Sequence, residues 1–559
     1  MEKITKKMIV AALAAILACG SCFEAGAQAQ PDKVQKKPAQ SNDFNLGKNL
    51  DIQYSILKSL AASYVDSVAF GKIVPVGIEA MLQSLDPYTT YITEDEEESF
   101  ELMTTGIYGG IGSLIKKRTD GGVLIFEPYT GSPAVKAGLQ PGDTIMEIDG
   151  HSVIGETSDQ SSSKMKGQPG TEVRFKVIKG RTGLTEDVTV VRERIHVSSI
   201  AYSGTVRDSI GYIYVSGFTD KVSDEFRESF LDLKKQGIKK LVIDLRDNGG
   251  GIMDEAIKMV GFFVPKGTLV VSSKGRHPQM NQEYHTNNEP LDTEIPILVM
   301  VNSSSASASE IFSGAMQDLD RGTIAGKRTF GKGLIQSVLP TPFDGKFKLT
   351  TGKYYTPSGR CVQALDYSHR NEDGSVGHVP DSLKREFKTA SGRSVYDGGG
   401  ITPDIEASAQ AYSRPAYSLV YNDILGEYSI VYYKSHESIA PVGEFHLTDA
   451  EYEDFIKFAE GKDFDCRGGA SASLDQLVVA AKADGLYDTY KKEIDALKSR
   501  IDMDKRTMLT VKKDEILPLL ESEIAIKYYY TEGGEAVRLR TDTQLFEALD
   551  KWDAAKTNN

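Results

Sequence analysis

The sequence predicts a multidomain α/β protein, with a small β domain ahead of an alternating α/β core and helical segments at both ends. Three patterns support this class. Residues 210–405 alternate short apolar runs with helical periodicity, residues 106–196 are rich in glycine and short β-type runs, and helical spacing returns after residue 408. A chain of 559 residues has room for three or four domains of about 150 residues each.

The domain boundaries are placed where the sequence pattern changes. A polar, proline-containing stretch predicts a tether, and the apolar residues that follow it at helical spacing, such as Ile56 and Leu60, predict N-terminal helices. The predicted segments are a signal peptide at 1–29, a flexible tether at 30–45, a helical N-terminal domain at 46–100, the small β domain at 101–196, the α/β core at 197–408 and a helical C-terminal domain at 409–559.

Within the core, continuous apolar runs predict buried strands at residues 210–215, 241–245 and 297–301. Between them, apolar residues at helical spacing predict helices. Because sites in α/β proteins gather at the carboxyl ends of strands, the motifs that follow these runs are the first candidates for function. The helical stripes are formed by Phe226, Phe230 and Leu233, by Ile257 and Val260, and by Ile311 and Met316.

The first residues predict export. Three lysines precede an apolar run at residues 8–18, which is too short to span a bilayer and is typical of a signal peptide. Small residues at 25–29 offer cleavage sites, whereas residues 16–19 resemble a bacterial lipobox that would leave a lipid on Cys19. The sequence leaves both outcomes open, and either one places the protein in the periplasm or cell envelope.

Composition argues against several classes of function. The 65 Lys and Arg residues against 79 Asp and Glu give a net charge of −14, which disfavours a general nucleic-acid binder. Of the four cysteines, only Cys361 and Cys466 lie beyond the leader, and their spacing does not establish a disulfide. No zinc-type cysteine pair or HExxH motif is found, so the sequence predicts no metal site.

The strongest candidate motif is the string of small residues at 302–310, between the strand at 297–301 and a predicted helix. A serine at a helix N-terminus, such as Ser307, benefits from the helix dipole and from free backbone N–H groups. The alternative is simple helix capping. A similar string at residues 470–473 is expected only to open a helix, so small residues alone are weak evidence.

The second candidate is Lys332, which is flanked by Gly331 and Gly333. Glycines permit close packing of the backbone around the lysine, and a buried lysine loses its charge more readily and can act as a base. An exposed lysine in a surface turn is the alternative. Gln336 follows on what is predicted to be the next strand.

Two glycine-rich segments complete the set. Residues 249–251 follow the strand at 241–245 and can direct backbone N–H groups at an oxyanion, or they can form a flexible turn. Residues 109–112 precede an extended segment and can bind a peptide carboxylate, or they can be an ordinary β-domain turn.

Taken together, and in their order along the chain (residues 109–112, 249–251, 302–310 and 329–333), the motifs resemble those of the C-terminal processing peptidases, also called tail-specific proteases. These are PDZ-containing serine endopeptidases with a Ser-Lys dyad. The resemblance covers roughly residues 50–405. Each motif is weak alone, but the ordered set is specific. Further shared segments are residues 85–87, 354–360 and 399–404.

The resemblance implies roles for individual residues. It assigns Ser307 as the nucleophile and Lys332 as the general base, 25 residues later, since 332 − 307 = 25. Gln336 matches the residue that supports the lysine. The backbone N–H of Ala308 would be one oxyanion donor. Glycines 249–251 would supply the other, with Gly249 and Gly250 preferred. Asp318 matches an acidic position to which we assign a structural role.

The resemblance also implies a ClpP/crotonase-like protease core with an inserted PDZ-like domain. In that domain Gly110, Ile111 and Gly112 would bind the substrate carboxylate, and Tyr108 stands close to where the family usually has an aromatic residue. The helical segment after residue 408 lies outside the shared region.

The function implied is that of an exported serine endopeptidase that cleaves proteins with apolar C-terminal tails, without cofactor or nucleic acid. The sequence leaves open whether the protein binds an adaptor protein, forms a homo-oligomer or is tethered to the membrane through a lipid on Cys19. The alternatives are a non-catalytic PDZ scaffold or apolar-ligand carrier on the same fold, and a metal- or histidine-dependent hydrolase. The presence of both Ser307 and Lys332 counts against the carrier.

Overall fold

The computed structural model describes residues 42–118, 121–207, 209–408, 411–501 and 504–557. The predicted signal peptide, with its cleavage sites and Cys19, lies outside these residues, as does most of the tether. The chain divides into two units, residues 1–74 and 75–559, which are described separately.

The first unit contains helix α2 (Asn42–Ser63) and the beginning of α3 (Phe70–Gln83). The tether predicted for residues 30–45 is wrong in its last four residues, because α2 begins at Asn42. The acidic Asp43 lies in the first turn of α2, where the helix dipole favours a negative charge. None of the α2 residues is buried. In the described part of the chain, no helix is both long and apolar enough to cross a bilayer.

The α/β core is built on a six-stranded sheet of order β10-β11-β12-β15-β16-β23, in which only β10 and β11 pair antiparallel. Its central strand β15 is wholly apolar and buried, and β12 is apolar and buried at residues 241–243, as expected for a parallel sheet covered on both faces. The strands are β10 (Ile200–Val206), β11 (Ile210–Val215), β12 (Lys240–Asp244), β15 (Ile297–Val301), β16 (Thr323–Gly326) and β23 (Ile405–Glu406).

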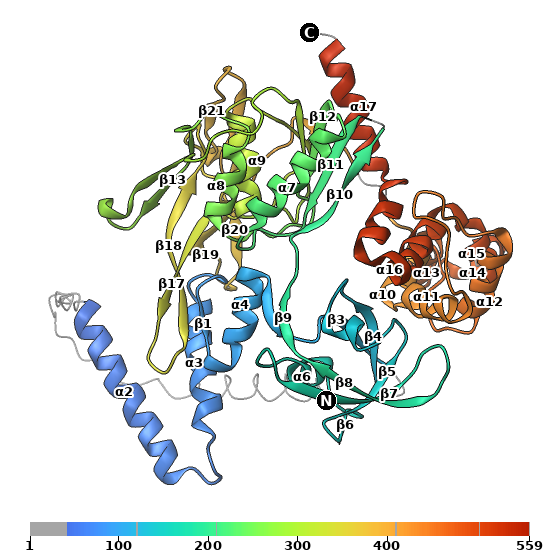
Figure 1. Ribbon diagram of the computed structural model, residues 1–559. Coiled ribbons are helices and arrows are strands. Elements are labelled where there is room, and N and C mark those ends of the chain that lie inside the picture. The colour runs from blue at the N-terminus through green and yellow to red at the C-terminus, as the bar shows by residue number, and fades with distance from the viewer. Residues whose placement is uncertain (1–41, 119–120, 208, 409–410, 502–503, 558–559) are drawn as a thin grey trace, which may run out of the picture. The chain divides into compact units, whose positions relative to one another are not determined.

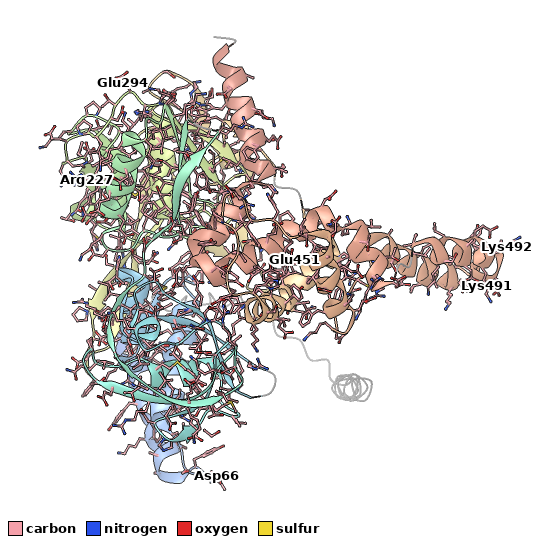
Figure 2. All side chains as sticks on the ribbon, turned by 45° about the vertical axis from the view of Figure 1, so that its right-hand side comes forward. Asp66, Arg227, Glu294, Glu451, Lys491 and Lys492 are labelled. Carbon is pink, nitrogen blue, oxygen red and sulfur yellow. The ribbon has the colours of Figure 1, made fainter. Side chains whose placement is uncertain are left out.

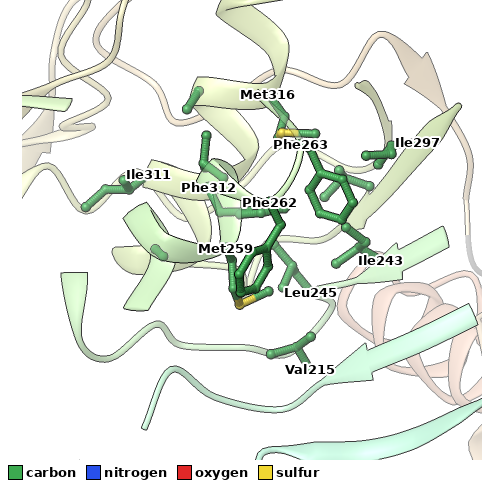
Figure 3. Close-up of a cluster of buried hydrophobic side chains, with 14 of the residues drawn as sticks. Val215, Ile243, Leu245, Met259, Phe262, Phe263, Ile297, Ile311, Phe312 and Met316 are labelled. Carbon is green, nitrogen blue, oxygen red and sulfur yellow. The ribbon is translucent and has the colours of Figure 1, made fainter. Parts of the chain in front are cut away.

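Three helices cover one face of this sheet: α7 (Val222–Lys235), α8 (Met253–Gly261) and α9 (Ala308–Asp318). Figure 3 shows side chains of α9 and of the end of α8 packed against Ile243 and Ile297. On the opposite face, α17 (Thr543–Thr557) packs Leu545 and Trp552 against Val242 and Leu298. The last helix of the predicted C-terminal domain at 409–559 therefore packs on the core sheet, which has two apolar faces to bury.

A second sheet lies beside the core. Strand β18 is its centre and pairs with β1, β13 and β17, and β13 also pairs with β14. Lys332 lies two residues before the start of β17, so this sheet positions the lysine. Its strands are β1 (Thr90–Ile92), β13 (Leu269–Gly275), β14 (Gln282–His285), β17 (Leu334–Pro340) and β18 (Lys346–Tyr355). Two hairpins follow in the chain, β19 (Leu365–Arg370) with β20 (Val376–His378), and β21 (Glu386–Lys388) with β22 (Ser394–Tyr396).

The PDZ-like domain has its own hydrophobic core, which includes Val123, Ile145 and Phe175. The chain enters it through α4 (Glu97–Thr105) and β2 (Ile107–Gly110) and leaves through β9 (Glu193–His196), which pairs with β2 (Figure 1). Its other elements are β3 (Ser113–Lys117), β4 (Val123–Pro128), α5 (Pro133–Lys136), β5 (Thr144–Ile148), β6 (His151–Ser152), α6 (Ser158–Met165), β7 (Glu172–Ile178) and β8 (Thr185–Val191).

The C-terminal helices form a further core around Phe455 and Ile516. The string at residues 470–473 lies in the first turns of α13, as predicted. Figure 2 shows Glu451 on α12 and Lys491 and Lys492 on α14. The helices are α10 (Arg414–Tyr421), α11 (Ile424–Ser435), α12 (Asp449–Glu460), α13 (Gly469–Ala483), α14 (Tyr487–Ile501), α15 (Lys505–Val511) and α16 (Lys513–Leu539).

The PDZ-like domain contacts these helices through charged groups. Lys116 Nζ lies 2.6 Å from a carboxylate oxygen of Asp423. The buried Glu127 carboxylate accepts the N–H of Thr531 at 2.7 Å and its hydroxyl at 2.6 Å. The preceding residue, Tyr530, interrupts α16 with φ 58° and ψ −170°. Glu127 thus satisfies an N–H group at a break in the helix.

Candidate active site

Ser307 is the N-cap of α9, directly after the turn that leaves β15. Its φ of 58° and ψ of −114° are unusual for a residue with a side chain, and strained conformations of this kind cluster at functional sites. The turn is attached to the end of β12 by buried serines. Ser305 donates its hydroxyl to the Leu245 carbonyl at 2.7 Å, and Ser309 donates to the Asn248 carbonyl at 2.9 Å.

Glu310 connects the serine turn with the lysine loop. One of its carboxylate oxygens accepts the backbone N–H of Ser307 at 2.9 Å and that of Lys332 at 2.8 Å. The other oxygen accepts the Gly331 N–H at 2.8 Å and the Thr329 hydroxyl at 2.6 Å. The structure therefore brings the two predicted dyad residues together, since their backbones share one buried carboxylate.

A second side chain also touches both residues. The Tyr354 hydroxyl, at the end of β18, lies 2.7 Å from the Lys332 carbonyl oxygen and 3.2 Å from that of Ser307. Tyr354 is itself buried, and burial raises the pKa of its phenol, so it stays a neutral donor. Glu310 and Tyr354 together hold the backbone of the serine and the lysine from two sides.

The electrostatics suit a lysine that acts as a base. Burial lowers the pKa of Lys332 from 10.5 to about 8, and the neighbouring Lys348 contributes to this lowering, while Glu310 and Asp86 oppose the shift. At pH 7 roughly a tenth of the lysine is then neutral. Burial also raises the pKa of Glu310, although its four hydrogen-bond donors favour the carboxylate.

The predicted oxyanion donors differ in their availability. The Ala308 N–H, in the first turn of α9, has no acceptor among the residues the structure describes, and neither has the Gly249 N–H. The Gly250 N–H is engaged, because it donates to the Asn248 side-chain oxygen at 2.8 Å. The Gly250 N–H is therefore not available as the predicted donor in this structure, and the N–H of Gly249 stays a prediction.

Gly250 has a different, steric role. With a φ of +99° it lies against the serine turn, and an added Cβ would come within 2.6 Å of the Ala306 carbonyl oxygen and 2.7 Å of the Ser307 Cβ. Only glycine fits this close approach without moving the serine.

Gln336 does not contact the lysine in the expected way. Its side-chain nitrogen donates to the Thr350 hydroxyl across the β17–β18 pair at 3.2 Å, and the described residues show no hydrogen bond between Gln336 and Lys332. Strand pairing directs this side chain along the sheet toward its neighbour.

Asp318 lies at the end of α9 and pairs with Arg360 at 2.7 Å, both side chains being almost completely buried. It also accepts the backbone N–H of Ser358 at 3.0 Å. Asp318 thus attaches the segment at residues 354–360 to α9, which agrees with a structural role.

The predicted carboxylate loop borders a groove of about 580 Å³. Ile111 lines this groove, with Gly110 and Gly112 on either side of it in the chain. The Ile111 carbonyl accepts the Ala134 N–H at 2.9 Å, which holds the loop in place. Groove residues from the other elements include Ser113 and Ile115 on β3, Met165 on α6 and Leu102 on α4.

Sequence reasoning missed several residues of the site. Glu310 stands in the sequence as the last member of the small-residue string, although its place three residues after Ser307 is a capping-box signal. Tyr354 begins one of the shared segments. Tyr88, whose ring centroid lies 4.5 Å from Lys332 Nζ, directly follows another, and neither residue has a local signal of its own. Cys361 and Cys466 are free thiols, so they form no disulfide. Among the described residues no cluster of metal-ligand side chains is found.

Comparison with known proteins identifies the class. Residues 209–367 match peptidase family S41, residues 109–190 match the PDZ domain, and residues 415–551 match the C-terminal helical domain of probable PDZ-proteases. These matches confirm the multidomain α/β fold class and the resemblance to PDZ-containing C-terminal processing peptidases.

Curated relatives include the probable CtpA-like serine proteases of Staphylococcus aureus and Staphylococcus haemolyticus. The first is 35% identical over 318 residues, 56% of this chain and 62% of the relative, and the second is 36% identical over 314 residues with the same coverage. The match therefore spans less than two thirds of the relatives' length. The solved photosystem II D1 C-terminal processing protease is 24% identical over 66% of this chain and 89% of its own, but its TM-score of 0.34 supports no structural argument.

Proposed function

We propose that this protein is an exported serine endopeptidase that cleaves protein substrates near their C-termini, with Ser307 as nucleophile and Lys332 as general base. The observation that carries the proposal is the single carboxylate of Glu310, which accepts the backbone N–H of both residues. This arrangement holds the backbone of a serine at a helix N-terminus close to that of a partly buried lysine, which supports their action in one nucleophilic site.

The reaction follows from these groups. Neutral Lys332 accepts the Ser307 Oγ proton as Oγ attacks the scissile carbonyl carbon, and the N–H groups of Ala308 and Gly249 stabilise the oxyanion. The lysine ammonium then protonates the leaving amine, which releases the C-terminal fragment. In the second half, neutral Lys332 takes a proton from water as it attacks the acyl-enzyme, and Ser307 recovers its proton.

The groove beside Ile111 accounts for the choice of substrate. An extended tail can pair with β3 as an added strand and place its carboxylate on the loop at residues 110–112. The apolar lining from Ile115 and Met165 favours apolar tails. The support for export, and for the alternative of a lipid on Cys19, is the sequence pattern of the leader.

The test compares the wild-type protein with Ser307→Ala and Lys332→Ala. Each is incubated with an unfolded protein that ends in apolar residues and with the same protein ending in two aspartates. Ser304→Ala and Lys327→Ala, at exposed positions in the same two segments, are the matched controls. We expect cleavage by wild type and controls only, faster on the apolar tail. Cleavage by either dyad variant would contradict the assignment.

A further inference from the structure

An aromatic ring from a distant part of the chain lies against the proposed general base. Lys332 Nζ is 4.5 Å from the centroid of the Tyr88 ring. Tyr88 belongs to the turn between α3 and β1, within residues 75–559, and is half-buried. Its ring meets that of Tyr367 edge-on, with centroids 6.1 Å apart and an interplanar angle of 85°. The ring is therefore supported on the side of β19.

The backbone of this turn is held rigidly. The buried Asp86 carboxylate accepts the N–H of Tyr88 and of Thr89, each at 2.8 Å, and the Thr89 hydroxyl at 2.9 Å. The Thr89 hydroxyl oxygen in turn accepts the Thr350 N–H of β18 at 3.2 Å. The same strand pairs with β17, which follows Lys332 in the chain. The ring and the lysine are thus both positioned by β18.

The charges around the amine indicate what this ring contributes. Lys348 on β18 repels the ammonium form of Lys332, whereas Glu310 on α9 and Asp86 in the turn attract it. Neither carboxylate makes a salt bridge with Lys332 among the described residues. The face of an aromatic ring carries partial negative charge and attracts a cation at this distance. The ring of Tyr88 therefore presents its negative face to the Lys332 amine and attracts this amine when it becomes charged.

We propose that Tyr88 is a positioning residue for Lys332, whose ring face holds the lysine amine in place and stabilises the ammonium that forms when Ser307 is deprotonated. This inference rests on the proposed function, because it assumes that Lys332 takes that proton. It also explains the Asp86-Pro87-Tyr88 segment, since Asp86 shapes the turn and the turn presents the ring.

The test is a graded change of the ring. Tyr88 is replaced by phenylalanine and by phenylalanines of increasing fluorination, which keep the ring's shape while weakening its negative face. Tyr88→Leu removes the ring altogether. The pKa of the Lys332 amine is measured by pulse labelling with an amine reagent across pH, with quantification of the Lys332 peptide by mass spectrometry. This readout does not depend on turnover.

We expect the labelling midpoint of Lys332 to fall steadily with fluorination, by about half a pH unit or more for the most fluorinated ring. Tyr88→Phe should stay close to wild type. The pH profile of kcat should move in parallel where cleavage is observed. A midpoint that is the same in the whole fluorinated series would overturn the proposal, even if Tyr88→Leu proved unfolded.

The same data separate the two levels of inference. The labelling midpoint could fall with fluorination although even the wild-type protein cleaves nothing. That result would support the contact between Tyr88 and Lys332 and would contradict the proposed function. Cleavage that requires Lys332, with a constant midpoint, would keep the proposed function and remove Tyr88 from it. Tyr91→Leu, in the adjacent β1, controls for general disturbance of this segment.

Discussion

The Glu310 carboxylate accepts the backbone N–H of Lys332 at 2.8 Å, although the two residues lie on different elements and the carboxylate is fully buried. The same oxygen holds the N–H of Ser307. One side chain therefore sets the distance between the serine turn and the lysine loop, which otherwise belong to separate parts of the core.

Replacing Glu310 should separate these two segments. In Glu310→Gln an NH₂ group replaces one of the two carboxylate oxygens. This group cannot accept the hydrogen bonds that the oxygen accepted, so at least one buried hydrogen bond is lost. We expect kcat/KM to fall about 100-fold or more and the free energy of unfolding to fall by about 1.5–3 kcal/mol. Peptidase assays and urea unfolding measure both effects, and the exposed Glu372→Gln is the control. Wild-type kinetics in Glu310→Gln would contradict the role of this carboxylate.

Two neighbouring glycines should respond differently to alanine. A Cβ at Gly250 would collide with the serine turn, and its φ of +99° disfavours a side chain, whereas a Cβ at Gly249 meets nothing within 4 Å. We expect Gly250→Ala to lower kcat about 100-fold or more through displacement of Ser307. Gly249→Ala keeps its N–H donor and should stay within a few-fold of wild type. Similar kinetics for both variants would refute this steric argument.

Activity should rise with pH. Burial, assisted by Lys348, lowers the pKa of Lys332 to about 8, so the neutral base becomes available as the pH passes through that value. The pKa in the folded state lies below the usual 10.5 of the unfolded chain. The unfolded chain thus binds more protons between about pH 8 and 10.5, so the cost of burying the charged lysine disappears and the free energy of unfolding rises over that window. A profile of kcat/KM from pH 6 to 10 checks the first point, and a flat profile would argue against a lysine base.

The contact between the PDZ-like domain and α16 should depend on an acceptor rather than on a charge. One oxygen of Glu127 accepts both groups of Thr531. Glu127→Ala leaves the N–H at the helix break unpaired, so the local opening free energy should fall by about 1–3 kcal/mol. Hydrogen exchange of β4 and of the break at Tyr530 should then accelerate. Glu127→Gln retains the oxygen and should exchange nearly as wild type; equal acceleration in both variants would favour charge as the cause.

The buried pair of Asp318 and Arg360 should matter for folding rather than for chemistry. Removing one partner leaves an uncompensated buried charge, so Asp318→Ala should lower the free energy of unfolding by about 3–5 kcal/mol. The double variant Asp318→Leu with Arg360→Met removes both charges and should recover much of that loss. Denaturant unfolding of the three proteins decides the point, and a double variant no more stable than Asp318→Ala would speak against the explanation.

Much of the fold could be predicted because local pattern and burial agree. The apolar runs at residues 210–215 and 297–301 became β11 and β15 with the same bounds, since continuous apolar residues suit a strand covered on both faces. The stripe of Phe226, Phe230 and Leu233 became the buried face of α7. The sequence did not predict where α17 packs, because the apolar face of an amphipathic helix does not specify which apolar surface it contacts.

The candidate site divides in the same way. The resemblance carried by the ordered set of motifs selected Ser307 and Lys332 as candidates, because each motif alone also fits a helix cap or a surface turn. Their catalytic roles stay a prediction. The direction of the Gln336 side chain, the engaged N–H of Gly250 and the ring of Tyr88 depend on strand pairing and on turns from other parts of the chain. By itself the sequence determined the class of fold, the order of its elements and the motifs that follow its strands, because these depend on neighbours in the chain. Only the tertiary structure decided that Glu310 joins the serine to the lysine, that Tyr88 lies against that lysine and that Glu127 meets α16, because contacts between distant residues are selected by packing and hydrogen-bond satisfaction.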